Sequence, residues 1–141
     1  MGAVAGLGVA AAFVWVGMVL GISFLEAPLK FGAPDVTLRI GLGIGRRVFR
    51  ALNAAEVVLA VLLLVSVVAG GLPTPATVSL VLAMALLAAQ LILVRPRLTR
   101  RSNAVLAGED APRSHAHHAY IALETIKLIA LVTGTTLTLA S

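Results

Sequence analysis

The stretch Phe24–Phe31 reads FLEAPLKF and marks the point where a long apolar run first meets charge and proline. Glu26 and Lys30 stand four residues apart, so a helix would place them on one face, with the acid in the favourable N-terminal position. Pro28 lies between them and lacks the N–H that an α-helix needs, which predicts a kink or an end of the helix. We therefore expect this stretch to form the inner end of a first transmembrane helix and one wall of a polar site.

The chain around this stretch is too apolar for a soluble protein. Of its 141 residues 60% are hydrophobic and 12% charged, with a mean hydropathy of +1.04, whereas soluble domains carry about 25% charged residues. Its apolar runs are long enough to cross about 30 Å of hydrocarbon and lack the period-two alternation of membrane β-strands. The sequence predicts an all-α integral membrane protein. It contains no cysteine, which excludes disulfides, thiolate metal ligands and cysteine nucleophiles.

We expect four spans in an up-down-up-down four-helix bundle that forms a single domain over residues 1–141. The spans cover about residues 4–24, 54–72, 77–94 and 119–140, and basic connections cover about 30–50 and 95–118. In the first connection Asp35 is a candidate helix cap, and the helix of the second span is expected to begin near Ile44. Asp110 and Pro112 predict the start of the last helix.

The distribution of basic residues predicts the orientation of the chain. Of the eleven Lys and Arg residues, five lie between Lys30 and Arg50, five between Arg95 and Arg113, and one in the fourth span. The positive-inside rule then places both basic connections in the cytoplasm and both termini outside a cytoplasmic membrane. There we expect the basic connections to contact anionic lipid headgroups rather than nucleic acid. The sequence leaves open whether the chain forms a homo-oligomer or joins a membrane complex.

Two features of the first span concern its packing. Gly17 and Gly21 are four residues apart and would let another helix approach closely, an interpretation balanced by the general abundance of glycine in membrane helices. Trp15 lies in the middle of the span and not at an interface, so we expect it to pack between helices.

Polar and ionisable groups inside the spans are the candidates for function, because each ionisable group costs about 2.5–3.5 kcal/mol to insert. Every predicted helix contributes some of them, and the predicted topology places all of them toward the cytoplasmic side. The candidate ligand-binding residues are Glu26, Lys30, Asn53, Glu56, Gln90, Tyr120, Glu124 and Lys127. We predict that they form one polar layer.

Three functions fit such a layer. The charges could be glue between helices, as in a structural or assembly subunit. They could instead bind a small ligand, substrate or redox cofactor from the cytoplasmic leaflet, with Glu56, Glu124 and Lys127 as binding or proton-transfer groups. A third function is a transporter or a path for ions or protons, although the outer halves of the spans offer few polar groups. The residues identify neither a cofactor nor a reaction.

Metal binding has little support in the sequence. Two-metal helical bundles use Glu-x-x-His pairs, but neither Glu56 nor Glu124 is followed by a histidine three residues later. His115, His117 and His118 form a cluster that we expect to be solvated at the interface. His117 shares helical register with Glu124 and is the one weak candidate for a metal or haem ligand.

Three segments carry a family resemblance: WVGM at 15–18, FLEAPLKF at 24–31 and GRRVFRALNAAE at 45–56. Together they resemble small four-helix bacterial membrane proteins of largely unknown function. More distantly, the Trp-x-Gly and Pro-x-x-Phe patterns resemble the first helix of HemJ-type protoporphyrinogen oxidase and copper-resistance D membrane proteins. That resemblance implies haem binding and an oxidase activity. The HemJ type has a histidine just after Pro-x-x-Phe, where this sequence has Gly32 and Ala33.

Overall fold

A computed structural model describes residues 2–112 and 115–141, which contain helices and no strand. The helices are α1 Ala3–Val19, η1 Leu20–Glu26, α2 Ala27–Lys30, α3 Leu38–Ala69, α4 Thr74–Ala89, η2 Gln90–Val94, α5 Arg95–Leu106 and α6 His115–Leu139. The segments η1 and η2 are π-helical. Because α1, η1 and α2 follow one another without a break, as do α4, η2 and α5, the chain forms four long helical segments.

Each of these four segments is long and apolar enough to cross a membrane. The shortest has 25 residues, which at 1.5 Å per residue gives a length of about 38 Å, more than the hydrocarbon thickness. Large apolar side chains such as Phe13, Val58 and Ile92 point outward from the bundle. The predicted all-α four-helix bundle is confirmed, and its four spanning helices identify a multi-pass membrane protein.

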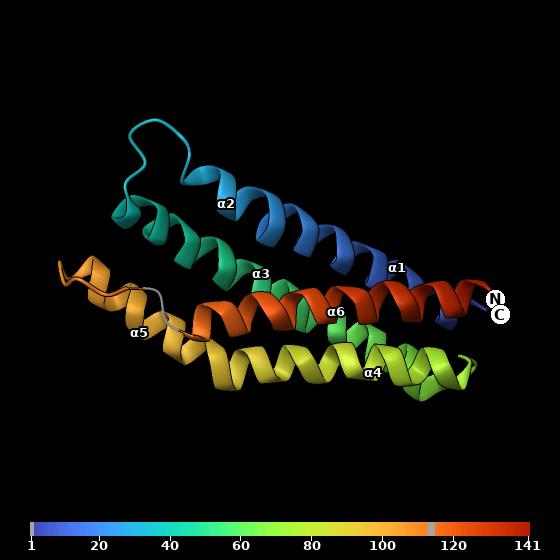
Figure 1. Cartoon of the computed structure of the whole chain (residues 1–141). Coiled ribbons are helices and arrows are strands. Elements are labelled where there is room, and N and C mark those ends of the chain that lie inside the picture. Colours follow the sequence, from blue (N-terminus) through green and yellow to red (C-terminus); the bar gives the residue numbers. More distant parts are fainter. Residues whose placement is uncertain (1, 113–114) are drawn as a thin grey trace.

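Successive segments run in opposite directions, so that both termini lie at one end of the bundle (Figure 1). The segment containing α1 packs against α3 and α6, and α4 packs along α6. The core residues between them are Trp15, Val19, Leu63, Leu80, Ala83, Leu87, Ala130 and Leu131. Trp15 is fully buried among them, which confirms that it packs between helices.

Two glycines other than the predicted pair allow helices to approach closely. A Cβ on Gly8 would lie 2.8 Å from Cβ of Ser66, and a Cβ on Gly134 would lie 2.6 Å from Cγ of Leu80. Gly8 therefore sets the contact of α1 with α3, and Gly134 sets that of α6 with α4. Gly17 and Gly21 have no such neighbour within 4 Å among the described residues. The predicted role of that pair in close packing inside the chain is wrong.

The second long helix begins earlier than predicted, at Leu38 and not near Ile44. Its cap is Thr37, whose hydroxyl oxygen accepts a hydrogen bond from the backbone N–H of Ile40 at 3.2 Å. Asp35, the predicted cap, lies in the preceding turn with a φ of 65°. Most of the basic stretch 30–50 is consequently helical.

The second basic stretch, 95–118, is also partly helical, because α5 extends the third span to Leu106. The last helix is described from His115. The helix was predicted to start at Asp110 and Pro112, but residues 110–112 are not helical. Residues 113 and 114 lie outside the described ranges.

Each π-helical segment ends two residues before a proline: η1 before Pro28 and η2 before Pro96. A proline ring clashes with the carbonyl four residues earlier in an α-helix, here that of Phe24 or Ile92, and each of these lies inside the π segment. The wider π turn accommodates the proline, so the helix continues. The first helix does not end at Pro28 but extends to Lys30.

Candidate functional site

A cluster of charged side chains is buried at the centre of the bundle around Lys127 of α6. Its ammonium nitrogen lies 2.5 Å from Oε1 of Glu124, one turn earlier on the same helix. It also donates hydrogen bonds to Oε2 of Glu56 on α3 and, at 2.8 Å, to Oε1 of Gln90 in η2. All three N–H donors of the ammonium group thus have an acceptor.

The first span completes the cluster with two side chains. Trp15 of α1 donates its indole N–H to Oε2 of Glu56 at 2.7 Å, and Ser23 of η1 donates its hydroxyl to Oε2 of Glu124 at 2.7 Å. Gln90 also donates to Oε1 of Glu124 at 3.3 Å. Each π segment therefore directs one polar side chain to the same carboxylate. We call these six residues the buried charge cluster: Trp15, Ser23, Glu56, Gln90, Glu124 and Lys127.

The cluster is closed to solvent. Glu56 and Lys127 are 0% exposed, and Gln90 and Glu124 are 1% exposed. It holds two carboxylates and one ammonium group, and burying such charges is tolerated only when nearly every lone pair and proton has a partner. Both oxygens of Glu124 accept hydrogen bonds. Oε1 of Glu56 is the one carboxylate oxygen of the cluster without a hydrogen-bond partner among the described residues.

One helical turn closer to the charged end of the bundle, cations stack on aromatic rings. The guanidinium carbon of Arg95 lies 4.7 Å from the ring centroid of Tyr120 and 5.3 Å from that of Phe49. The two rings meet edge to face at 6.0 Å. Lys30 lies 5.5 Å from the ring of Phe31 and 5.9 Å from that of Phe49. We call these five residues the cation–aromatic layer; the positive charge of Arg95 offsets the excess negative charge of the neighbouring cluster.

The predicted polar layer is thus divided into two. Glu56, Gln90, Glu124 and Lys127 come together in the buried charge cluster, and Lys30 and Tyr120 belong to the cation–aromatic layer. The remaining two residues belong to neither layer. Glu26, whose side chain is 37% exposed, forms an ion pair with Lys30 at 3.6 Å, and Asn53 makes no side-chain hydrogen bond to the described part of the chain.

The ring of His117, the weak metal candidate, meets that of His118 edge to face at 5.6 Å. Within residues 2–112 and 115–141 no three histidine, aspartate or glutamate side chains are grouped to hold a metal ion.

Five residues of the two layers are absent from the predicted set: Trp15, Ser23, Phe31, Phe49 and Arg95. A signal for the first two exists, because Trp15, Val19 and Ser23 recur every four residues and so share one helical face. A tryptophan in the middle of a span predicts packing between helices. It does not by itself predict that the indole N–H of Trp15 donates to the carboxylate of Glu56. Arg95 follows an apolar span, and its sequence context predicts only that it belongs to a basic connection.

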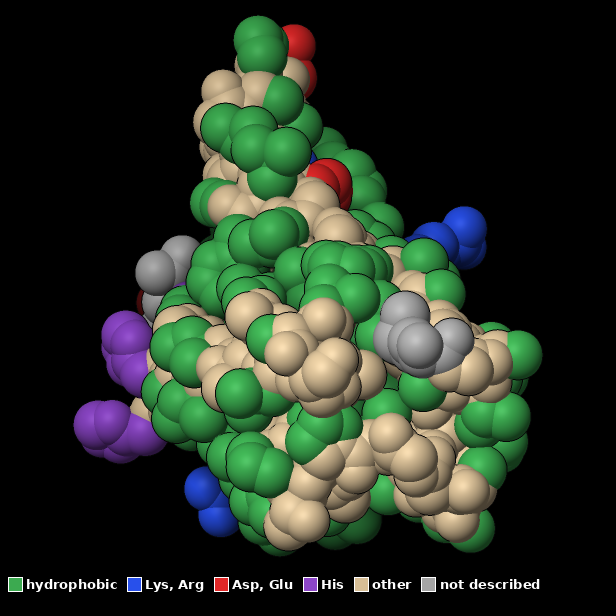
Figure 2. Space-filling model, turned by 90° about the vertical axis from the view of Figure 1, so that its right-hand side faces the viewer, with side chains coloured by type: hydrophobic (Ala, Val, Ile, Leu, Met, Phe, Trp, Pro, Cys, Tyr) green, Lys and Arg blue, Asp and Glu red, His purple; other side chains and the backbone are tan. Residues whose placement is uncertain are grey.

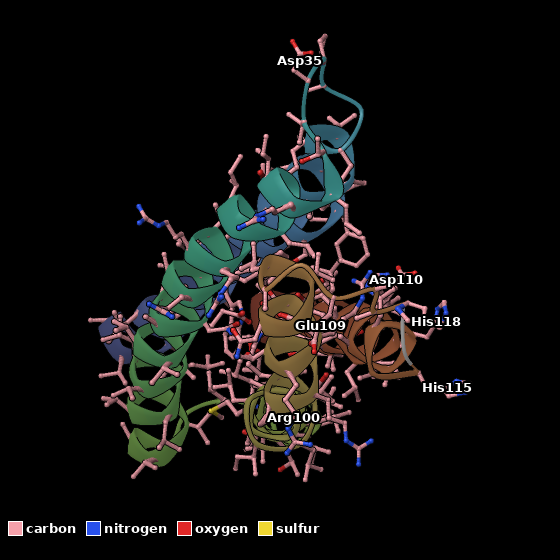
Figure 3. All side chains as sticks on the ribbon, turned by 90° about the vertical axis from the view of Figure 1, so that its left-hand side faces the viewer. Asp35, Arg100, Glu109, Asp110, His115 and His118 are labelled. Atoms are coloured by element: carbon pink, nitrogen blue, oxygen red, sulfur yellow. The ribbon has the colours of Figure 1, made fainter. Side chains whose placement is uncertain are left out.

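The charged groups outside the spans gather at the end of the bundle opposite the termini. Figure 3 shows Asp35, Arg100, Glu109, Asp110, His115 and His118 at this end. Around the termini Figure 2 shows mainly hydrophobic and uncharged side chains, and the few charged side chains in this view lie away from that region. Two hollows lie at the charged end, one of about 350 Å³ lined by Arg97, Arg100, Arg101, His115 and Ala116, and one of about 280 Å³ lined by Gly43, Arg46, Arg47, Arg50 and Leu106.

No protein-family model, curated protein or solved structure matches this chain. The resemblance to HemJ-type and copper-resistance D membrane proteins therefore stays a prediction. The geometry of the buried charge cluster and of the charged end is what bears on function.

Proposed function

We propose that this protein resides in a cytoplasmic membrane with both termini on the outer side. The support is the asymmetry of charge between the two ends of the bundle (Figures 2 and 3). Arginines retained on the cytoplasmic side of a membrane fix the orientation of the spans next to them. The two connections rich in arginine lie together at the end opposite the termini, as an even number of spans requires.

We further propose that the protein is a structural or assembly subunit of the membrane, in which the buried charge cluster locks four helices into one arrangement. The observation that carries this proposal is a single hydrogen-bonded network with a side chain from each spanning segment. In lipid the hydrophobic effect gives helices little reason to associate, so packing and interhelical hydrogen bonds decide their arrangement. Lys127 bonds to two other helices at once, and any sliding of one helix would leave a buried charge without its partner.

The hydroxyl groups in the outer half of the bundle favour a lock over an ion path. Ser66 donates to the carbonyl of Val4 at 2.8 Å, and Ser79 to that of Ala130 at 2.8 Å. Thr135 and Thr138 donate to carbonyls one turn earlier on α6. These hydroxyls are occupied by backbone groups, so they do not extend the buried charge cluster into a chain of polar groups across the bundle.

The metals and small molecules bound to the purified protein distinguish a structural role of the buried charge cluster from a ligand or cofactor site. We expect protein purified in a mild detergent to be colourless and to contain neither a stoichiometric metal nor a stoichiometric non-lipid small molecule. The measurement is native mass spectrometry combined with metal analysis and an absorption spectrum. A stoichiometric chromophore or small molecule whose occupancy falls in a Glu56→Gln variant would contradict the proposal and favour a ligand site at the cluster.

Because the chain has no cysteine, single cysteines test the orientation without background labelling. Ser141→Cys and Thr99→Cys replace exposed, uncharged residues at opposite ends of the bundle and leave the number of arginines unchanged. In intact cells a membrane-impermeant maleimide is expected to label the cysteine at position 141. The cysteine at position 99 is expected to react only after permeabilisation. The reverse pattern would show that the orientation is inverted.

A further inference from the structure

The smaller hollow at the charged end is built from two helices. Arg46, Arg47 and Arg50 line it from α3, and Leu106 lines it from α5. Gly43 also lines it, and a Cβ added there would have no neighbour within 4 Å among the described residues. The hollow of about 280 Å³ is therefore open where Gly43 lies and is surrounded by three cations.

The three arginines of the hollow have no ion pair or hydrogen bond to the described part of the chain. Two arginines outside the hollow do have protein partners: Arg101 donates to the carbonyl of Ala111 at 3.0 Å, and Arg95 stacks on two rings. Guanidinium groups that share one hollow repel one another unless an anion lies between them. A phosphate group suits this position, because its oxygens accept paired hydrogen bonds from guanidinium donors.

Apolar side chains on the membrane side of the hollow indicate where the phosphate comes from. Val57, Val58 and Val61 follow the arginines along α3 and are 44%, 60% and 54% exposed. A free phosphate ion would make no contact with these side chains. A phospholipid would cover them with its acyl chains while its headgroup reaches the arginines.

We propose that the hollow between α3 and α5 binds the phosphate group of an anionic phospholipid, whose acyl chains cover Val57, Val58 and Val61. This site is separate from the buried charge cluster and does not depend on the proposed locking role. It holds the phosphate of one lipid at a defined position, in addition to the general attraction of the basic end for an anionic membrane surface.

The test uses the full chain in nanodiscs of phosphatidylcholine, titrated with phosphatidylglycerol, with bound lipid counted by native mass spectrometry. Arg46→Gln and Arg50→Gln are each expected to weaken phosphatidylglycerol binding about fivefold, the effect of one arginine at a membrane surface. The matched control is Arg39→Gln, which removes the same charge from an exposed position of α3 outside the hollow. It is expected to leave binding unchanged.

A further variant fills the hollow without changing charge. Gly43→Leu places a side chain in open space, and we expect it to weaken binding as the arginine variants do. Equal weakening by Arg39→Gln and the hollow variants would show general attraction and overturn the proposal, as would unchanged binding in Gly43→Leu and both arginine variants. Displacement of the bound lipid by millimolar inorganic phosphate would identify free phosphate as the occupant and overturn the assignment to lipid.

Discussion

Replacing Lys127 by methionine is expected to lower the free energy of unfolding by about 3–5 kcal/mol, the cost of breaking a buried ion pair by removing one partner. Glu56 and Glu124 would then face each other without the cation that they share, and Oε1 of Gln90 would lose its donor. Methionine fills nearly the same volume, so the loss of charge and not a cavity would dominate. The measurement is reversible unfolding in mixed detergent micelles.

Two controls make this result specific to the cluster. Lys30→Met removes a lysine that pairs with the partly exposed Glu26 and lies over two aromatic rings, and we expect a smaller loss of about 1–2 kcal/mol. The double variant Glu56→Gln with Lys127→Met removes both partners together and should lose less than the sum of the two single variants. Additive losses, or equal losses at Lys30 and Lys127, would contradict a coupled interhelical lock.

The second large effect concerns the contact of α4 with α6. Gly134→Ala is expected to destabilise the protein by about 1–3 kcal/mol, the usual cost of overpacking a tight contact. The new methyl group would lie 2.6 Å from Cγ of Leu80 and 3.3 Å from the carbonyl oxygen of Ala76, and the carbonyl belongs to the α4 backbone and cannot rotate away. The two helices would have to move apart. The same unfolding measurement detects the change.

Gly17→Ala is the matched substitution at a position with open space. Its methyl group would have no neighbour within 4 Å in the described chain, so only the intrinsic helix preference changes, which favours alanine by up to about 1 kcal/mol. We expect opposite signs for the two glycines. A destabilised Gly17→Ala protein would instead point to a contact at Gly17 that forms outside the single chain.

The sequence was sufficient to find the spans and the charged members of the cluster. Glu56, Gln90, Glu124 and Lys127 stand out because each interrupts a long apolar run, a signal that needs no knowledge of structure. Their depth along the chain also indicated that they would meet. The division of the polar residues into two layers could not be predicted, because it depends on which face each helix turns inward.

The contribution of Arg95 cannot be predicted from an α-helical repeat. Arg95 directly follows a π segment, where the repeat of 3.6 residues no longer describes which side chains share a face. The early start of α3 was missed for a different reason. Gly41, Gly43 and Gly45 weaken helix propensity in a basic stretch, yet the membrane interface and the cap at Thr37 keep it helical.

The π segments before Pro28 and Pro96 also bear on how this chain would align with a relative. Each π turn amounts to one extra residue inserted into an α-helix, because the same rise of the axis contains one residue more. A relative with one residue fewer between Trp15 and Pro28 can be α-helical throughout and still orient its later residues as here. In a relative of the same length without the π turn, the later residues would be rotated by about 100°, so its counterparts of Glu26 and Lys30 would face different neighbours. The number of residues between Trp15 and Pro28 therefore indicates how the side chains near Pro28 are oriented.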